Sequence, residues 1–242
     1  MGHLVVINCH QWIHFVGAAL QSVANQTRTA DGVLVVLDPG DHDTEYLDLM
    51  AEWPVHFMAM PEHRGIAAGR NAGFDWAVAH DFDWVSFLDE DDLYWPTYME
   101  EMHKATVLCP WVKLFYPDWA EFAQDSPLRR FHSTPEFDRN LLLKTPYIVS
   151  ASTIHTAVWL AVKEKNGIGY DTELERQGLR WEDYLFYIEA ALLGFQFCRV
   201  GLGLLKVRQH KGQGSEIANQ TTEQWTKYVK EKLERLYASP RT

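Results

Sequence analysis

The sequence has few cysteines and no long apolar run. Its 242 residues include only three cysteines, Cys9, Cys109 and Cys198, which lie far apart and show no metal-ligand spacing. We therefore expect buried thiols in a reducing compartment. No apolar stretch approaches the roughly 20 residues of a membrane span, and no basic region followed by an apolar one opens the chain. We expect a cytoplasmic protein without a transmembrane segment or signal peptide, and leave peripheral contact with a membrane open.

Positive charge is also scarce relative to negative charge. The chain has 22 Lys and Arg residues against 33 Asp and Glu residues, which gives a formal net charge of −11. An acidic surface disfavours nucleic acid and anionic membranes as nonspecific partners. An anionic substrate must therefore be held locally, by a metal ion or by a few well-placed cations. The hydrophobic content of 47% is typical of a folded chain with a sizeable core.

Several common nucleotide-binding and hydrolytic motifs are absent. The sequence has no phosphate-binding loop of the type G-x-x-x-x-G-K-[ST], and no G-x-G-x-x-G follows its first apolar run. It contains neither G-x-S-x-G nor H-E-x-x-H. ATPase and dinucleotide-dependent functions therefore lose their usual support. A nucleotidyltransferase would share an α/β sheet, but no Gly-rich, Lys-containing loop follows the first strand.

The most informative stretch that is present is 87–92, Phe-Leu-Asp-Glu-Asp-Asp. Its four acids follow the apolar run Trp84–Leu88, which is short enough to be a buried strand rather than a helix. Acids at the end of such a strand lie at the carboxyl edge of a sheet, where ligands bind in open α/β folds. Two aspartates one residue apart offer oxygen ligands to Mg²⁺ or Mn²⁺, which can neutralise a diphosphate. The alternative is that Asp91 or Asp92 caps the helix that starts near Pro96.

Strands and helices are expected to alternate along the first part of the chain. Strands are predicted at 4–7, 32–37, 55–58 and 84–88, and helices at 15–23, 44–52 and 65–80. This order implies an α/β fold with a mostly parallel central sheet flanked by helices. Further strands are predicted at 111–116, 148–154, 197–200 and 204–208, and helices at 96–107, 157–165, 181–193 and 222–237. Residues 117–146 show no clear period, and the apolar stripe of the last helix favours packing on its own domain.

Five motifs, in order along the chain, resemble those of glycosyltransferase family 2. Leu20–Thr27 resembles the family's L-x-S-V-x-x-Q-T, and Val35–Thr44 resembles V-V-D-D-G-S-x-D-x-T. Arg64–Gly73 resembles x-G-x-x-x-A-R-N-x-G, and Phe87–Asp92 resembles F-L-D-x-D-D, which contains the DxD element. Trp181–Tyr184 resembles the later and shorter E-D motif. The resemblance implies the GT-A fold, with a Rossmann-like nucleotide-binding half and an acceptor half.

The resemblance covers residues 4 to about 215 and departs from the family at two positions. Pro39 stands where the family has the second Asp of D-D-G, so contacts to the base or ribose near it are expected to differ. Gly69 replaces the usual Ala before Arg-Asn, which loosens that helix turn slightly. The implied organisation is a single GT-A domain over 1–242, with a nucleotide-sugar-binding half at 1–95, an acceptor and catalytic half at 96–215 and a C-terminal helix at 216–242.

The resemblance also implies which residues bind the donor. Asp38, at the end of the second strand, is expected to contact the nucleotide base, and Asp89 is expected to contact the ribose. Arg70 is the expected cation near the base and diphosphate, because an Arg fork suits phosphate oxygens. Gly65 is expected to have a positive φ or to permit close backbone approach. Simpler interpretations stay open: Asp38 as a turn residue and Arg70 as a surface charge on a helix.

A metal site is implied around the DxD element. Asp91 is the expected ligand of Mn²⁺ or Mg²⁺, and Asp92 either assists or caps the next helix. Related enzymes bring a late histidine to the metal, which implies His210 here, although a solvent-loop histidine is the alternative. Arg208 and Lys211 are candidates for the diphosphate, in a segment that the following glycines would allow to close as a lid.

Asp183 is the expected general base, because it matches the E-D motif, and Glu182 is a possible accessory residue. The implied reaction moves a sugar from a nucleotide-diphosphate sugar to an acceptor hydroxyl with inversion of configuration. Both acids are also ordinary residues for the first turn of a helix. A retaining transferase, in which Asp183 only binds, and a catalytically silent sugar-nucleotide-binding module stay open.

The substrates are only partly implied. Uridine is the expected donor base, with guanosine and thymidine diphosphosugars left open. The acceptor is a glycan, a lipid-linked saccharide, a small molecule or a modified nucleobase, and the acidic charge balance weakens the last of these.

Overall fold

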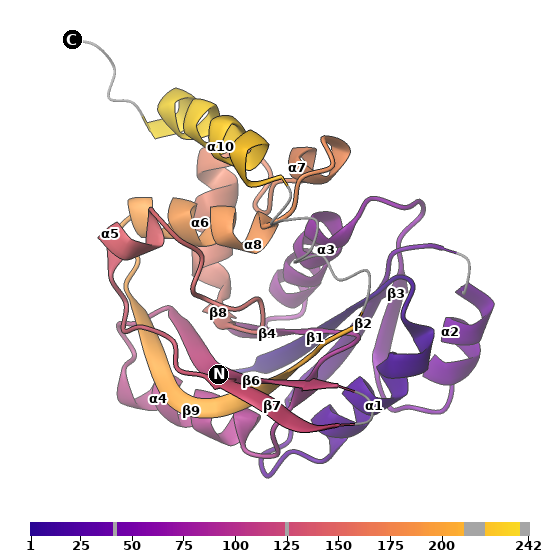
Figure 1. Cartoon of the computed structure of the whole chain (residues 1–242). Coiled ribbons are helices and arrows are strands. Elements are labelled where there is room, and N and C mark those ends of the chain that lie inside the picture. Colours follow the sequence, from indigo (N-terminus) through magenta and orange to yellow (C-terminus); the bar gives the residue numbers. More distant parts are fainter. Residues whose placement is uncertain (41–42, 124–125, 211–220, 238–242) are drawn as a thin grey trace.

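The computed structural model describes residues 1–40, 43–123, 126–210 and 221–237 (Figure 1). The strands are β1 His3–Cys9, β2 Gly32–Leu37, β3 His56–Ala59, β4 Trp84–Asp89, β5 Leu93–Tyr94, β6 Leu114–Ala123, β7 Ser126–His132, β8 Thr153–His155 and β9 Phe197–Arg208. The helices are α1 Ile13–Ala24, α2 Asp43–Met50, α3 Ile66–Ala79, α4 Tyr98–Leu108, α5 Arg139–Leu142, α6 Thr156–Asn166, α7 Glu173–Arg176, α8 Glu182–Leu192 and α10 Thr222–Tyr237.

A single mixed sheet joins strands from both parts of the chain. Its order is β3-β2-β1-β4-β8-β6-β9-β5, and β7 pairs with β6 at one side. The strands β3, β2, β1 and β4 are all parallel. In this register Cys9 aligns with Leu37, and Asn8 aligns with Asp89. The carboxyl ends of β1, β2 and β4 therefore meet at one edge, where the predicted strand-end acids are brought together. The α/β fold expected from the sequence is confirmed.

The later strands differ from the sequence-based prediction. The two strands expected at 197–200 and 204–208 form one strand, β9, which runs parallel to β6 with register shifts around Asp118. Gly203, between the two predicted strands, lies under the ring of Phe131, where an added Cβ would collide with that ring. Close approach, rather than a turn, accounts for this glycine. The stretch 117–146 contains most of β6, all of β7 and α5, and only the end of 148–154 is strand.

The sheet is covered by helices on both faces (Figure 1). Successive residues of β1 alternate between two cores, with Leu4 and Val6 in one cluster and Val5 and Ile7 in the other, all with no exposed surface. The first cluster includes buried residues of α3, α6, α8 and α10, and the second includes buried residues of α1, α2 and α4. Strands buried on both faces are typical of α/β sheets and fix their register firmly.

The C-terminal helix packs on its own domain, as its apolar stripe predicted. Trp225 of α10 is buried, and its ring stacks on Tyr184 of α8 with centroids 4.8 Å apart. Lys232 is also buried and pairs with Asp171 at 2.8 Å between Nζ and Oδ2. Along the described ranges, none of the helices combines the length and apolar character that crossing a membrane requires.

Candidate functional site

A cavity of about 1530 Å³ lies at the carboxyl edge of the parallel strands. It is bounded by the ends of β1, β2 and β4, by the start of α3 and by the start of α8. The predicted site residues that line it are Asp38, Gly65, Arg70, Asp89, Asp91, Asp92, Glu182 and Asp183. The fold thus gathers acids from three separate segments around one space, as the strand-end argument predicted for those of β2 and β4.

Asp38 is buried at the end of β2, and its carboxylate faces the segment that leads into α3. Its Oδ1 accepts from the amide of Arg64 at 2.8 Å, and its Oδ2 accepts from the amide of Gly65 at 2.7 Å. Gly65 has the expected positive φ, +81°. The expected close approach there comes from Glu175 of α7, which binds the amides of Ile66 at 3.0 Å and Ala67 at 3.2 Å. A Cβ on Gly65 would collide with this carboxylate.

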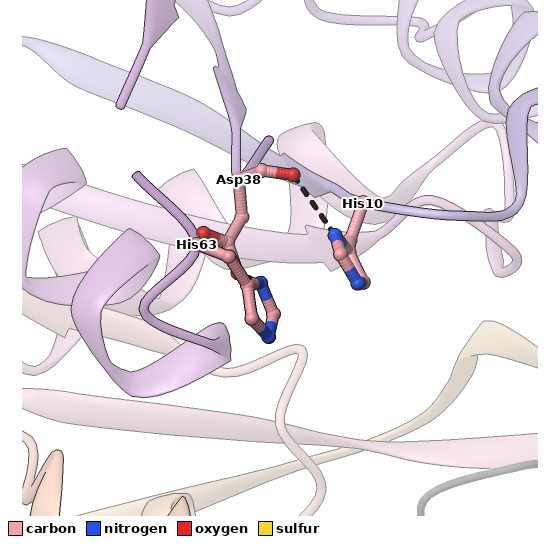
Figure 2. A group of neighbouring side chains, drawn as sticks. All are labelled: His10, Asp38 and His63. Carbon is pink, nitrogen blue, oxygen red and sulfur yellow. Dashed lines mark hydrogen bonds and ion pairs between the residues drawn. The ribbon is translucent and has the colours of Figure 1, made fainter. Parts of the chain in front are cut away.

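Two histidines flank Asp38, as Figure 2 shows. His63 Nδ1 lies 2.7 Å from Asp38 Oδ2, and His10 Nδ1 lies 2.9 Å from the backbone oxygen of Asp38. The two imidazole rings stack with centroids 4.4 Å apart and an interplanar angle of 19°. Metal-ligand atoms of the three residues lie within 4.8 Å of one another. Because the rings are nearly parallel, their nitrogen lone pairs do not converge on one point, so the geometry does not favour a metal ion held by all three residues.

The DxD element places Asp91 beside His210. Asp91 Oδ2 lies 2.8 Å from His210 Nε2, and the His210 ring packs against Trp12 at 4.5 Å between centroids. Burial and the nearby charge of Asp89 raise the pKa of Asp91, and His210 opposes this shift. A carboxylate that has other negative charges nearby and an imidazole beside it suits a divalent cation such as Mn²⁺. The residues present therefore fit the metal that the sequence implies.

The other candidates near the DxD element have mainly structural contacts. Buried Asp92 accepts from the amide of Arg208 at 2.9 Å and so ties the turn after β4 to the end of β9. Arg208 Nε donates to the backbone oxygen of Asp91 at 2.7 Å. Its guanidinium also lies over the rings of Phe15 and Phe122, at 4.2 and 4.4 Å. Lys211 and the predicted glycine-rich lid lie outside the described residues.

Arg70 is buried among the acids of the site. Its NH1 lies 3.0 Å from Glu182 Oε1 and 4.0 Å from Asp183 Oδ2, and its NH2 lies 3.4 Å from Asp89 Oδ1. The guanidinium side chain is only 2% exposed, so Arg70 is not the surface helix charge that the sequence left open. It links the end of β4 to the start of α8, whereas the resemblance implied contact with the base and diphosphate.

Asp183 lies at the start of α8 with its side chain 16% exposed. Burial, and then the charge of Glu182, raise the pKa of Asp183 to about 7, while Arg70 opposes the shift. The preceding Trp181 has φ +65° and ψ +41°, a left-handed conformation that is costly for a bulky residue. Such strain clusters at functional sites, because the surrounding structure must hold it in place. The arrangement supplies a carboxylate able to accept a proton near neutral pH.

Sequence reasoning missed several residues of the site. Ser150 donates to Asp89 Oδ2 at 3.0 Å, and Glu175 occupies the amides at the start of α3. His63 directly precedes the family-like motif Arg64–Gly73, and its stack with His10 has no local signal. Glu90 belonged to the recognised acidic stretch, yet nothing in that stretch indicated its partners. Each contact joins segments far apart in the sequence, so local patterns do not show them.

Comparison with known proteins agrees with this fold. The family model described as glycosyl transferase family 2 matches residues 4–153. The chain belongs to this family and is a glycosyltransferase, which takes its sugar from a nucleotide sugar. Members of the family commonly use a divalent metal. No curated protein matches the chain.

Solved structures of TarS from S. aureus show the same fold at low sequence identity. The 1–349 form in complex with UDP-GlcNAc is 14% identical with a TM-score of 0.73, and the match covers 99% of this chain and 68% of that chain. The 1–349 form with UDP is 15% identical with a TM-score of 0.68, at 99% and 67% coverage. A longer TarS chain is 14% identical with a TM-score of 0.67, and this chain spans 41% of it.

Proposed function

We propose that this glycosyltransferase moves a sugar from a UDP-sugar to an acceptor hydroxyl with inversion, using a divalent metal at Asp91 and His210 and Asp183 as general base. The observation that carries the proposal is that one cavity is lined by Asp38, Asp89 and Asp91 together with Asp183. A donor-binding edge and a proton acceptor thus face the same space. The likeness of the fold to TarS bound to UDP-GlcNAc supports uridine as the base.

The donor side of the cavity fits a nucleoside diphosphate. Asp38 is held by two backbone amides, so its carboxylate is aimed rather than free to rotate. Such a carboxylate accepts a hydrogen bond from the ring N–H of uracil, and the imidazole of His10 offers a flat neighbour for the base. We assign the ribose hydroxyls to Asp89, which accepts a hydrogen bond from Ser150 and pairs with Arg70.

The metal element would bear the negative charge of the leaving group. Asp91 and His210 would hold the ion, and a bound divalent cation neutralises charge that develops on the departing diphosphate. The buried acids here disfavour an anionic donor without such compensation, and burial and the charge of Asp89 already raise the pKa of Asp91. The net charge of −11 likewise disfavours an anionic donor over the molecule as a whole.

Asp183 would take the proton of the acceptor. The acceptor oxygen attacks the anomeric carbon, the bond from that carbon to the diphosphate oxygen breaks, and the hydroxyl proton passes to Asp183. Attack from the face opposite the leaving group inverts the anomeric configuration. A base with pKa about 7 is matched to work near neutral pH. Arg70 positions the general base Asp183, because it bridges Asp183 and Glu182 to the donor-side Asp89.

A donor panel tests the proposal. Release of free nucleoside diphosphate is measured for UDP-, GDP- and dTDP-sugars, with and without Mn²⁺, and the anomeric configuration of the product is read by NMR. We expect release from a UDP-sugar that requires the metal. Release from GDP- or dTDP-sugars alone would overturn the assignment of uridine as the donor nucleoside. A product of retained configuration would overturn the role of Asp183 as general base.

A further inference from the structure

Glu90 makes an unusual set of contacts within the acidic turn after β4. Its side chain is buried, with 5% of the residue exposed, between the donor-side Asp89 and the metal-side Asp91. One oxygen, Oε1, accepts from three consecutive amides: His10 at 2.9 Å, Gln11 at 3.1 Å and Trp12 at 3.1 Å. The other oxygen accepts from the hydroxyl of Tyr46 on α2.

We propose that Glu90 is a positioning residue of the transferase site, which fixes the segment His10–Trp12 relative to the metal-binding turn. The inference rests on the function proposed above. A buried carboxylate is costly unless its oxygens are satisfied, and here both are. In return, Glu90 satisfies amides that lead into α1, whose N-cap residue Trp12 makes no side-chain cap of its own. Its negative charge also suits the positive end of the α1 dipole.

The clamped segment carries a side chain to each half of the donor site. His10 bonds to the backbone of Asp38 and stacks on His63, where we place the base. Trp12 packs against His210, which pairs with Asp91, where we place the metal. Because Glu90 itself lies in the turn that holds Asp91, one carboxylate sets the spacing between the site proposed for the base and the site proposed for the metal. That spacing must match the span of a nucleoside diphosphate for both ends to bind at once.

The test uses three substitutions of Glu90 that change the clamp in different ways. Glu90→Gln keeps an oxygen for the three amides, and its NH₂ can donate to the hydroxyl of Tyr46. Glu90→Ala removes the clamp, and Glu90→Asp keeps the charge but is one methylene too short to reach all three amides. Tyr46→Phe is the matched control, because it loses a partner of Glu90 while leaving the amide contacts intact. Thermal unfolding of each variant is recorded, and binding is measured well below the lowest midpoint.

The readout is UDP affinity by calorimetry, with and without Mn²⁺, together with the steady-state constants for the donor. We expect Glu90→Ala and Glu90→Asp to weaken Mn²⁺-supported UDP binding by about 10- to 100-fold, the usual range for residues that orient metal ligands. The donor KM should rise with little change in kcat at saturation, because Asp183 lies on a different element. Glu90→Gln should bind within a few-fold of the unaltered chain, and so should Tyr46→Phe even where it lowers the unfolding midpoint.

Two results would overturn the inference. One is Mn²⁺-supported UDP affinity in Glu90→Asp that equals that of Glu90→Gln, which keeps the test decisive if Glu90→Ala does not fold. The other is a loss in Tyr46→Phe as large as in Glu90→Asp, which would show general destabilisation instead of positioning. Asp91→Asn is measured alongside. If this variant also leaves Mn²⁺-supported binding unchanged, the proposed metal site is wrong, and the result does not count against the role of Glu90.

Discussion

The imidazole of His63 donates to the carboxylate of Asp38, with Nδ1 2.7 Å from Oδ2, and stacks on His10 at 4.4 Å between ring centroids. A flat ring that stacks on a neighbour and gives a hydrogen bond to a carboxylate is how a uracil ring would bind at Asp38. His63 therefore occupies part of the space proposed for the base. Its side chain is 58% exposed, so it can move from this space into solvent.

The first prediction is that His63→Ala binds UDP more tightly than the unaltered chain. The bound base no longer has to displace a hydrogen bond from Asp38, which we expect to be worth about 1 kcal/mol or a five-fold change in affinity. Calorimetry with UDP and Mn²⁺ measures this. His80→Ala, which removes an exposed histidine at the end of α3, is the control. Weaker binding in His63→Ala would mean that His63 contacts the base instead of standing in for it.

The second prediction concerns the general base. Asp183→Asn should lower turnover by about 10²- to 10⁴-fold, the usual contribution of a positioned general base. UDP affinity should be nearly unchanged, because Asp183 lies on α8 and the donor contacts lie at the ends of β2 and β4. Single-turnover rates and calorimetry on the same preparation separate the two effects. Turnover within a few-fold of the unaltered enzyme would place the base elsewhere.

The third prediction is the pH dependence of that base. Its carboxylate must be deprotonated to accept a proton, so activity should fall as pH drops below the Asp183 pKa of about 7. Glu182→Gln removes a negative neighbour that raises this pKa, so the acidic limb should move to lower pH. The kcat profile between pH 5 and 8 at saturating donor and metal reports the shift. A limb that stays in place, or moves to higher pH, would contradict the assignment.

The sequence predicted the parts of the site that follow from local pattern. Asp38, Asp89 and Asp91 were found because each follows an apolar strand, and parallel strands end at one edge. Gly65 was singled out by its place in the family-like motif, and the positive φ that was one of its two expected reasons is present. These features depend on residues within a few positions of one another, which is why a single sequence is enough to indicate them.

The parts that the sequence did not predict depend on contacts between distant segments. The burial of Arg70 depends on Glu182, which arrives with α8. The clamp of Glu90 on the amide of His10 joins positions 80 residues apart. The strand predicted at 111–116 continues as β6 to Ala123, where it pairs with β9 through register shifts near Asp118. Tertiary pairing decides all three, so no local periodicity encodes them.

The fourth prediction tests Asp91, the proposed metal ligand in the turn after β4. Asp91→Asn should abolish the Mn²⁺ dependence of UDP binding while the fold persists. Burial and the charge of Asp89 raise the pKa of Asp91, so its ionised form is disfavoured in the folded chain. A neutral residue of the same shape therefore should not lower stability. Calorimetry with and without Mn²⁺, together with thermal unfolding, checks both parts. An unchanged Mn²⁺ dependence would remove Asp91 from the metal site.

The last prediction concerns His210, whose Nε2 lies 2.8 Å from Asp91 Oδ2. A neutral imidazole beside a carboxylate is a suitable pair of ligands for Mn²⁺, and the ring is held by contacts with Trp12 and Phe15. We expect His210→Ala to weaken Mn²⁺-supported UDP binding by about 10-fold or more, while binding without metal stays the same. His14→Ala is the matched control, because this exposed imidazole also contacts Phe15 but is not paired with Asp91. If both variants lose the same amount, the aromatic packing matters and the ligand role does not. If neither changes the response to Mn²⁺, His210 takes no part in metal binding.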